Sequence, residues 1–318
     1  SHLVSGHHAV HEALEHELAS FAGKPAALAF MNGYVANLAL LMTLAGDGDA
    51  IFSDELNHAS IVDGARLSRA TVEVYPHADV DTLEAMLRSS TARQRLVVTD
   101  AVFSMDGDIA PLAALLALCE RHDALLVIDD AHGIGVLGPE GRGSVHALGL
   151  QSDCIVYMGT LGKAAGLSGA FVAADQLIID RLIQRGRPYV FSTASLPALA
   201  HATLTALELV RSADAARKQL ASHRQRLREF ASAWRPFRLL ASATPIQPLV
   251  IGDNATVVRI AEALLQEGLW VPAIRPPTVP AGSARLRITL SGAHSDEDVA
   301  RLGAALSHII SSTGAIPA

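Results

Sequence analysis

The chain has few cysteines, no excess of positive charge and no long apolar run among its 318 residues. The 2 cysteines, Cys119 and Cys154, show no disulfide spacing, which favours a reducing compartment such as the cytoplasm. A formal net charge of -7 without a basic stripe argues against nucleic acid as a partner. No apolar run is long enough to cross a bilayer, so we expect no membrane partner.

Half of the residues are hydrophobic, which is enough to bury a core, and the length predicts one large domain and one smaller domain. Short apolar runs alternate with amphipathic stretches, as expected for an α/β fold whose mostly parallel sheet has helices on both faces, in three layers. The predicted strands cover residues 26–30, 50–53, 71–75, 95–100, 124–129, 154–158 and 169–173. The predicted helices between them cover residues 35–44, 59–67, 80–87 and 112–121.

The pattern changes in the second part of the chain. A long helical stretch covers residues 196–234, and three short predicted strands and two helices follow it. The strands are expected at residues 248–251, 270–274 and 286–290, and the helices at 256–267 and 296–311. We therefore predict a large domain over residues 1–234 and a small C-terminal α+β domain over residues 235–318.

A glycine-rich turn at residues 159–166 contains Lys163, and an apolar strand ends at Asp129 shortly before His132. Ligands of parallel sheets bind beyond the carboxyl ends of the strands, so these side chains are expected at one edge. A lysine among small neighbours with no nearby acid suits a Schiff base with an aldehyde cofactor, namely pyridoxal 5'-phosphate (PLP). A dry, glycine-lined site would favour the neutral amine, whereas a single lysine on a loop is more often simply solvated.

Asp129 is then expected to face the pyridine nitrogen of the cofactor. A carboxylate there keeps the nitrogen protonated, so that the ring can accept electrons from the substrate carbon. The alternative for an aspartate at the end of a strand is a helix cap, and we prefer that interpretation for Asp130. A functional interpretation of His132 depends on these neighbours, because a lone histidine after a strand is more often structural.

Four motifs in order along the chain resemble those of the α-oxoamine synthases. They are NHAS at residues 57–60, VFSMDGD at 102–108, DDAHG at 129–133 and TLGK at 160–163. Members of this family are PLP enzymes of the aspartate-aminotransferase fold type (fold type I), and they join an amino acid to an acyl thioester with loss of carbon dioxide. The resemblance runs from Ser5 nearly to the C-terminus, and it implies that the chain is an acyltransferase.

The resemblance also implies roles for the residues around the cofactor. His132, with Ser104 beside it, would bind the phenolic oxygen, and His58 would stack on the ring and reach the substrate carboxylate. The phosphate is expected at Gly33 and Tyr34, where a glycine turn opens a helix, with the hydroxyl of Thr160 nearby. By similarity, Ser192 and Thr193 would reach the phosphate of a partner subunit. The resemblance therefore implies a homodimer with its active site at the subunit interface.

Substrate recognition is expected to use fixed positive charge, because an amino acid and a dicarboxylic acyl chain are both anionic. Arg287 resembles the family arginine that holds the amino-acid carboxylate. Arg275 and Thr278 lie on a proline-stiffened loop that resembles the acyl-binding element. Any one of these arginines could instead be a surface charge. The loop at residues 273–280, followed by RLR at 285–287, looks most like the family member of biotin biosynthesis, which joins L-alanine to a pimeloyl group.

The pimeloyl donor could be a coenzyme A or a carrier-protein thioester, and the sequence leaves this open. A glycine C-acetyltransferase, which joins glycine to acetyl-CoA, is the nearest alternative. A catalytically impaired protein of the same fold is another, because the family's N-terminal arm, which helps to close the site, is expected to be missing before Ser1.

Three further patterns bear on other functions. Residues 133–138 fit the G-x-G-x-x-G dinucleotide pattern, but Pro139 argues against a helix opening there. His7 and His11 could share a helix face, yet the H-E-x-x-H spacing to His16 is absent, so we expect a solvated amphipathic helix and no metal. No G-x-S-x-G elbow marks an ordinary hydrolase.

Overall fold

The structure is a computed structural model, and it describes residues 1–312. It divides into two compact units. Unit 1 contains Ser1–Phe103 and Ala110–Ala213, and unit 2 contains Ser104–Ile109 together with the chain from Asp214 onward. The boundary between residues 213 and 214 lies inside the helical stretch predicted over residues 196–234. The predicted domain boundary lies further along the chain, between residues 234 and 235.

Unit 1 is built on a seven-stranded sheet, in the order β1-β7-β6-β5-β4-β2-β3. The strands are β1 (Ala26–Phe30), β2 (Ala50–Asp54), β3 (Thr71–Tyr75), β4 (Arg95–Asp100), β5 (Leu125–Asp129), β6 (Ile155–Thr160) and β7 (Ala170–Ala174). Neighbouring strands from β3 to β6 are parallel, whereas β7 pairs antiparallel with β6 and with β1. The predicted α/β class with a mostly parallel sheet is therefore confirmed.

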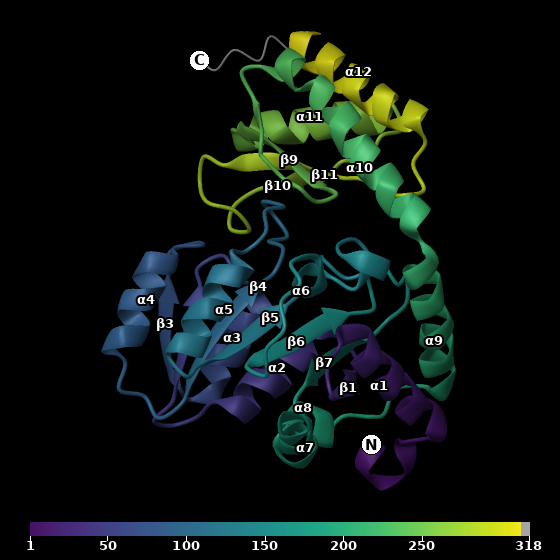
Figure 1. Cartoon of the computed structure of the whole chain (residues 1–318). Helices are drawn as coiled ribbons and strands as arrows, with labels where there is room; N and C mark the ends of the chain where they lie inside the picture. Colours follow the sequence, from purple (N-terminus) through teal and green to yellow (C-terminus); the bar gives the residue numbers. More distant parts are fainter. Residues whose placement is uncertain (313–318) are drawn as a thin grey trace. The chain divides into compact units, whose positions relative to one another are not determined.

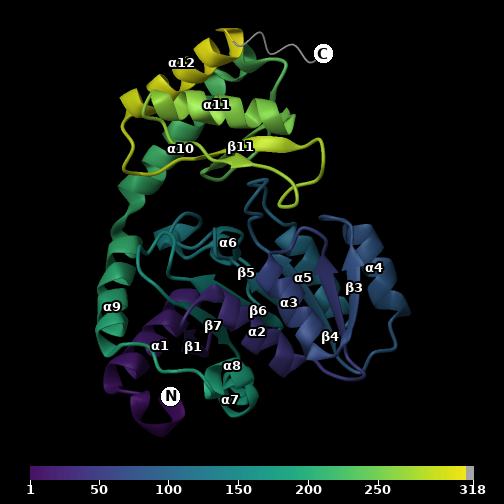
Figure 2. The ribbon, with the colours of Figure 1, turned by 180° about the vertical axis from the view of Figure 1, so that it is seen from behind.

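Helices cover both faces of this sheet (Figure 1, Figure 2). Buried side chains of α1, α4, α5 and α9 form the core on one face, and those of α2, α3, α7 and α8 form the core on the other. The helices are α1 (Ala9–Ala22), α2 (Gly33–Leu44), α3 (Ala59–Ser68), α4 (Val80–Ser89), α5 (Leu112–Arg121), α6 (Ser144–Ala147), α7 (Gln176–Arg185), α8 (Arg187–Val190) and α9 (Pro197–Ser212). Among residues 1–312, no helix combines the length and apolarity that a membrane span requires.

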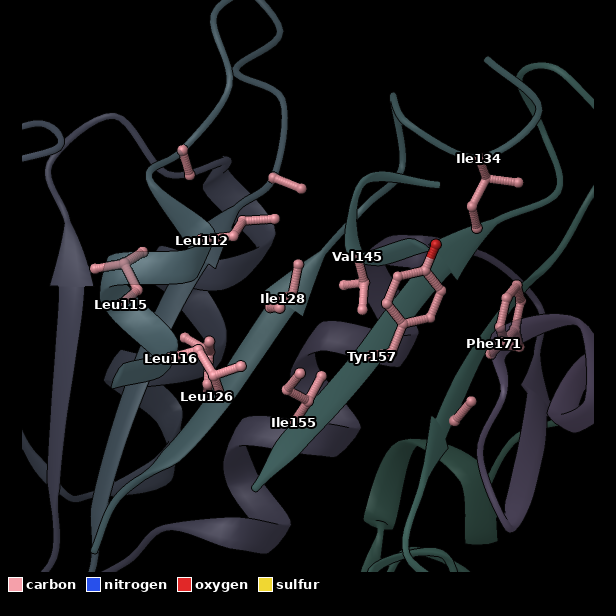
Figure 3. Close-up of a cluster of buried hydrophobic side chains, with 14 of the residues drawn as sticks. Leu112, Leu115, Leu116, Leu126, Ile128, Ile134, Val145, Ile155, Tyr157 and Phe171 are labelled. Atoms are coloured by element: carbon pink, nitrogen blue, oxygen red, sulfur yellow. The ribbon is translucent and has the colours of Figure 1, made fainter. Parts of the chain in front are cut away.

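The central strands read as continuous apolar runs because both of their faces are buried. Figure 3 shows one of these faces, where Leu126 and Ile128 of β5 lie beside Ile155 and Tyr157 of β6. Glycine is required at position 159 of β6, because a Cβ there would lie 2.0 Å from Cδ1 of Ile134. This close approach lets the turn after β5 close over the end of β6.

Unit 2 has a four-stranded antiparallel sheet, in the order β10-β11-β9-β8. Its strands are β8 (Arg238–Leu239), β9 (Ile246–Gly252), β10 (Ala273–Ile274) and β11 (Ala284–Thr289), and its helices are α10 (Asp214–Glu229), α11 (Asn254–Gln266) and α12 (Asp296–Ser312). The helices pack on the sheet through a separate core that includes Leu227, Leu264 and Leu306. The buried Trp234 contributes its indole ring to this core and donates its N–H to the Ser307 hydroxyl at 3.1 Å.

Candidate active site

Two aspartates end adjacent parallel strands of unit 1 at the same level. Asp100 is the last residue of β4 and Asp129 is the last residue of β5, and the two are paired in the strand register. Both side chains are buried. The Asp129 carboxylate accepts hydrogen bonds from the Asn37 amide of α2 at 2.8 Å and from the backbone N–H of Ala131 at 3.0 Å. Its orientation is therefore fixed from two sides.

Burial dominates the electrostatics of this pair. Burial raises the pKa of Asp129, against the hydrogen bonds from Asn37 and Ala131 and the positive charge of Lys163. Burial, followed by the negative charge of Asp129, raises the pKa of Asp100 well above its usual range. A buried carboxylate is stabilised in its charged form by a cationic donor, so this edge of the sheet suits a ligand with a positively charged N–H group.

Lys163 lies in the turn that follows β6, on the side of the sheet where Asp100 and Asp129 sense its charge. The turn is closed by a hydrogen bond of 3.0 Å from the backbone N–H of Gly166 to the Lys163 carbonyl. The Lys163 side chain is exposed and has an interaction partner, and the dry surroundings expected for it stay a prediction.

His58 caps the start of α3 beside the two carboxylates. Its backbone N–H donates to the Asp100 carboxylate at 2.7 Å, and its ring Nδ1 accepts from the backbone N–H of Ser60 at 3.2 Å. The side chain of Asn57 ties this turn to β4, because it donates to the Val98 carbonyl at 2.8 Å and accepts from the Asp100 N–H at 2.8 Å. The exposed imidazole is thus held at the same sheet edge as Asp129.

The predicted phosphate site falls at the start of α2. Asn32 caps this helix by accepting the backbone N–H of Val35 at 2.9 Å, and Gly33 is its first residue. A Cβ on Gly33 would lie 4.0 Å from the Thr160 hydroxyl, so the helix start and the end of β6 are adjacent. Unpaired N–H groups and the helix dipole favour an anion here. The exposed Tyr34 donates its hydroxyl to Asp63 at 2.5 Å.

The other predicted cofactor residues of unit 1 lie in connecting segments. His132 follows β5 and is half-buried, and it also has an interaction partner. Ser192 follows α8, is half-buried and donates its hydroxyl to the Pro188 carbonyl, whereas Thr193 is exposed. Their contacts with a cofactor stay predictions.

In unit 2 the structure brings together Arg287 and Ser104. The Arg287 Nε donates to the Ser104 carbonyl at 2.6 Å, and one terminal nitrogen donates to the Thr289 hydroxyl at 2.8 Å. Burial lowers the pKa of Arg287. The neighbouring Arg285 is buried and pairs with Asp106 at 2.5 Å, which assigns it a structural role.

Arg275 and Thr278 are exposed residues of one loop after β10. The Thr278 N–H donates to the Arg275 carbonyl at 3.0 Å, which closes the loop into a turn. Both residues line a cavity of about 310 Å³ together with Asn254, Ala273, Ile274 and Pro276. The loop that resembles the family's acyl-binding element therefore borders a cavity.

Sequence reasoning missed two side chains that position Asp129 and His58. Asp100 ends an apolar strand as Asp129 does, and that shared pattern could have revealed it. Asn37 carried no such signal, because one amide in an apolar helix looks like any other polar residue. Its donor role depends on α2 lying against the end of β5, which only the fold establishes.

The aminotransferase class I and II family matches residues 3–306 of the chain. The 8-amino-7-oxononanoate synthase of Azoarcus sp. (strain BH72) is 55% identical over 309 residues, which cover 97% of this chain and 79% of that protein. The 8-amino-7-oxononanoate synthase of Burkholderia cenocepacia (strain HI2424) is 57% identical over 314 residues, covering 96% and 77%. The chain therefore belongs to the class I and II aminotransferase family.

Within that family its specific similarity is to the 8-amino-7-oxononanoate synthases, which confirms the resemblance inferred from the motifs. A solved 8-amino-7-oxononanoate synthase from Francisella tularensis superposes with a TM-score of 0.85 at 29% identity, covering 96% of this chain and 89% of that one. The Sphingomonas wittichii serine palmitoyltransferase gives a TM-score of 0.92 at 35% identity, covering 100% and 80%.

PLP is the cofactor of this family, and the residues of unit 1 fit it. The buried Asp129 suits the protonated pyridine nitrogen, which is a cationic N–H donor of the kind that its surroundings favour. The start of α2 beside Thr160 suits the phosphate, because Gly33 leaves its backbone N–H groups uncovered by a side chain. Lys163 supplies the only amine among the residues that we have placed at this edge of the described sheet.

Proposed function

We propose that the chain catalyses the condensation of L-alanine with a pimeloyl thioester, which yields 8-amino-7-oxononanoate, carbon dioxide and a free thiol. The observation that carries this proposal is the identity of 54% to 57% with 8-amino-7-oxononanoate synthases over almost the whole chain. The strand-end carboxylate and the lysine in unit 1 support it, because the reaction needs a stabilised negative charge on carbon and a proton carrier.

Bound PLP supplies an electron sink for the charge that develops on the α-carbon of the amino acid. Asp129 holds the proton on the pyridine nitrogen, and Asn37 fixes the carboxylate for that task. Lys163 would hold the cofactor, and its amine would carry the proton from the α-carbon of the amino acid and back to the product. His58 covers one face of the ring.

Anionic groups of the cofactor and the amino acid have further proposed partners. Gly33, Tyr34 and Thr160 would hold the phosphate, and His132 and Ser104 would hold the phenolic oxygen. Arg287 binds the carboxylate of L-alanine, because a guanidinium offers it two parallel donors. The half-buried position of Arg287 supports this role, since part of the cost of desolvating its charge is already met by the Ser104 carbonyl.

The acyl group is assigned to the cavity beside Arg275 and Thr278. Ile274 and Pro276 offer apolar surface for the methylene chain, and the guanidinium of Arg275 offers a charge partner for its distal carboxylate. An acetyl group has neither a methylene chain nor a distal carboxylate. This cavity therefore favours the longer dicarboxylic chain over the acetyl group used by a glycine C-acetyltransferase.

A homodimer in the cytoplasm is also part of the proposal. The segment around Ser192 and Thr193 exposes large apolar side chains, with Phe191 and Leu196 each 71% exposed, which supports a second copy as its partner. Cys119 and Cys154 are free thiols, which supports a reducing compartment.

The substrate assignment is tested by supplying the PLP-loaded protein with pairs of amino acids and acyl thioesters and measuring free thiol. We expect L-alanine with pimeloyl-CoA or a pimeloyl carrier protein to release thiol, and mass spectrometry to identify the amino-ketone. Arg275→Ala should raise KM for the pimeloyl donor about 10- to 100-fold with a smaller change in kcat, because it removes a charged hydrogen bond. Thiol release only from glycine with acetyl-CoA would overturn the assignment.

A further inference from the structure

Three imidazole rings converge where the chain enters α1, outside the residues assigned to the reaction. His2 lies in the short helical turn His2–Gly6, His7 follows that turn, and His11 lies in the first turn of α1. One ring nitrogen from each residue lies within 4.8 Å of the other two. The ring centroids are 5.0 to 5.5 Å apart in all three pairs. We call these residues the three-histidine cluster.

The cluster is held in place by packing. His11 is 1% exposed, and His2 and His7 are half-buried. The Tyr189 ring stacks on His2 with a centroid distance of 5.4 Å and an interplanar angle of 5°. Nδ1 of His2 and Nδ1 of His7 are 3.1 Å apart, so two nitrogens already point toward one another.

Of the outward-facing nitrogens, that of His11 has a hydrogen-bond partner of the kind that metal-bound histidines commonly use, and that of His7 faces an acidic residue. Nε2 of His11 lies 3.1 Å from the Ser195 carbonyl, and Nε2 of His7 lies 3.7 Å from the Glu15 carboxylate. A carbonyl or carboxylate behind a ligating ring fixes the tautomer and turns the other nitrogen toward the ion. This second layer is an observation independent of the clustering of the rings.

We propose that His2, His7 and His11 bind one divalent transition-metal ion of the Zn²⁺ class. Zinc takes histidine nitrogens at about 2.0–2.1 Å in a tetrahedral arrangement, which places neighbouring nitrogens roughly 3.3 Å apart. The observed 3.1 Å between the His2 and His7 nitrogens is close to that spacing. Imidazole ligands suit Zn²⁺, Cu²⁺ and Ni²⁺, whereas Mg²⁺ and Ca²⁺ prefer oxygen.

Binding exchanges hydrogen bonds for metal bonds at the cluster. Nδ1 of His11 accepts the backbone N–H of His8 at 3.1 Å, and Nε2 of His2 accepts the N–H of Ser195 at 3.3 Å. Coordination through Nδ1 replaces the contact of His11 with the His8 N–H and the 3.1 Å contact between Nδ1 of His2 and Nδ1 of His7. It also places the proton of His2 on Nε2, so that the contact with the Ser195 N–H is given up.

The ion would act as a structural clamp. It would fasten the start of α1 to the segment that contains Tyr189 and Ser195, and this segment also contains Ser192 and Thr193. Because the cluster assembles in the folded chain, bound metal should stabilise the folded state. The sequence pattern did not reveal the site, since the third ligand, His2, comes from the turn before the helix.

The test titrates ZnCl2 into the untagged, EDTA-treated and dialysed full chain loaded with PLP, by isothermal calorimetry. We expect saturable uptake of one ion per chain and a rise in melting temperature with added Zn²⁺. His7→Ala and His2→Ala should each weaken uptake about 100-fold or more, since each removes one of three ligands. His16→Ala is the matched control, because His16 is an exposed histidine of α1 outside the cluster.

Melting curves in EDTA verify that the variants are folded. Retention of Zn²⁺ binding by either His2→Ala or His7→Ala would overturn the three-histidine site, as would the absence of saturable uptake by the wild-type chain. Loss of uptake in His16→Ala to the same degree would also contradict it. The readout is metal binding, so it is independent of the proposed acyl transfer.

Discussion

Asp129 shows how the fold prepares a charged side chain for a cofactor. Its carboxylate is buried, and within residues 1–312 one amide and one backbone N–H donate to it. A second buried carboxylate, Asp100, lies at the same level of the next strand. Burial of both carboxyl groups and the negative charge of each near the other disfavour their ionised forms. The positive charge of Lys163 favours the ionised form of both. A cationic ligand at this edge therefore lowers the pKa of Asp129 more than it would lower the pKa of a solvated aspartate.

Glu15 gives a prediction about pH at the residue scale. Burial raises the pKa of this α1 residue to about 7, although its carboxyl accepts the Ala29 N–H at 3.0 Å. A carboxyl whose pKa is higher in the folded state stabilises the protein below its unfolded pKa, and this stability is lost as pH rises through the folded pKa. The contribution of Glu15 should therefore fall between about pH 4.5 and pH 7.

The measurement compares melting temperatures of the wild type and Glu15→Gln at intervals from pH 5 to pH 8, in EDTA. Relative to the variant, the wild type should become progressively less stable as pH rises, by on the order of 1–3 kcal/mol across the range. Glu120→Gln, at an exposed glutamate of α5, should show no such trend. A difference between wild type and Glu15→Gln that does not change with pH would contradict the buried-carboxyl account.

At the scale of elements, the sequence predicted the strands of unit 1 to within about two residues at their ends. Each predicted strand is a short apolar run because it is buried on both faces, and its end is marked by a polar residue or glycine turn. Asp129 could be located for that reason, since it ends its strand, whereas Thr160 lies two residues beyond the predicted end of β6 and was located from its motif. The roles of these residues toward a cofactor stay predictions, because they rest on the family resemblance.

Other features of the elements could not be read from local patterns. The order of the strands and the antiparallel direction of β7 depend on how the connections cross the sheet. The helical stretch predicted over residues 196–234 is two helices, α9 and α10, with Ala213 between them. Apolar periodicity continues across this break, and no helix stop signal marks it.

At the scale of the whole molecule, the proposed homodimer predicts that two inactive variants can complement one another. Lys163→Ala lacks the amine in its own site, and the double variant Ser192→Ala with Thr193→Ala lacks hydroxyls that would serve the partner subunit. Subunit exchange between them should restore about a quarter of wild-type activity, because about half of the dimers are mixed and each has one intact site.

Sedimentation velocity of the same preparations should give the mass of two chains. A mixture that is no more active than the separate variants would argue that Ser192 and Thr193 act within their own subunit. A wild-type chain that sediments as a monomer at assay concentrations would contradict the dimer itself.

The central claim is that Lys163 holds PLP, and covalent labelling tests it most directly. The chain contains three lysines, Lys24, Lys163 and Lys218. Lys24 is engaged with the Ser152 carbonyl at 2.7 Å. Borohydride reduction of the PLP-loaded protein, followed by peptide mapping with mass spectrometry, should place the label on Lys163 alone. A label on Lys24 or Lys218, or no label on a chain saturated with PLP, would contradict the account.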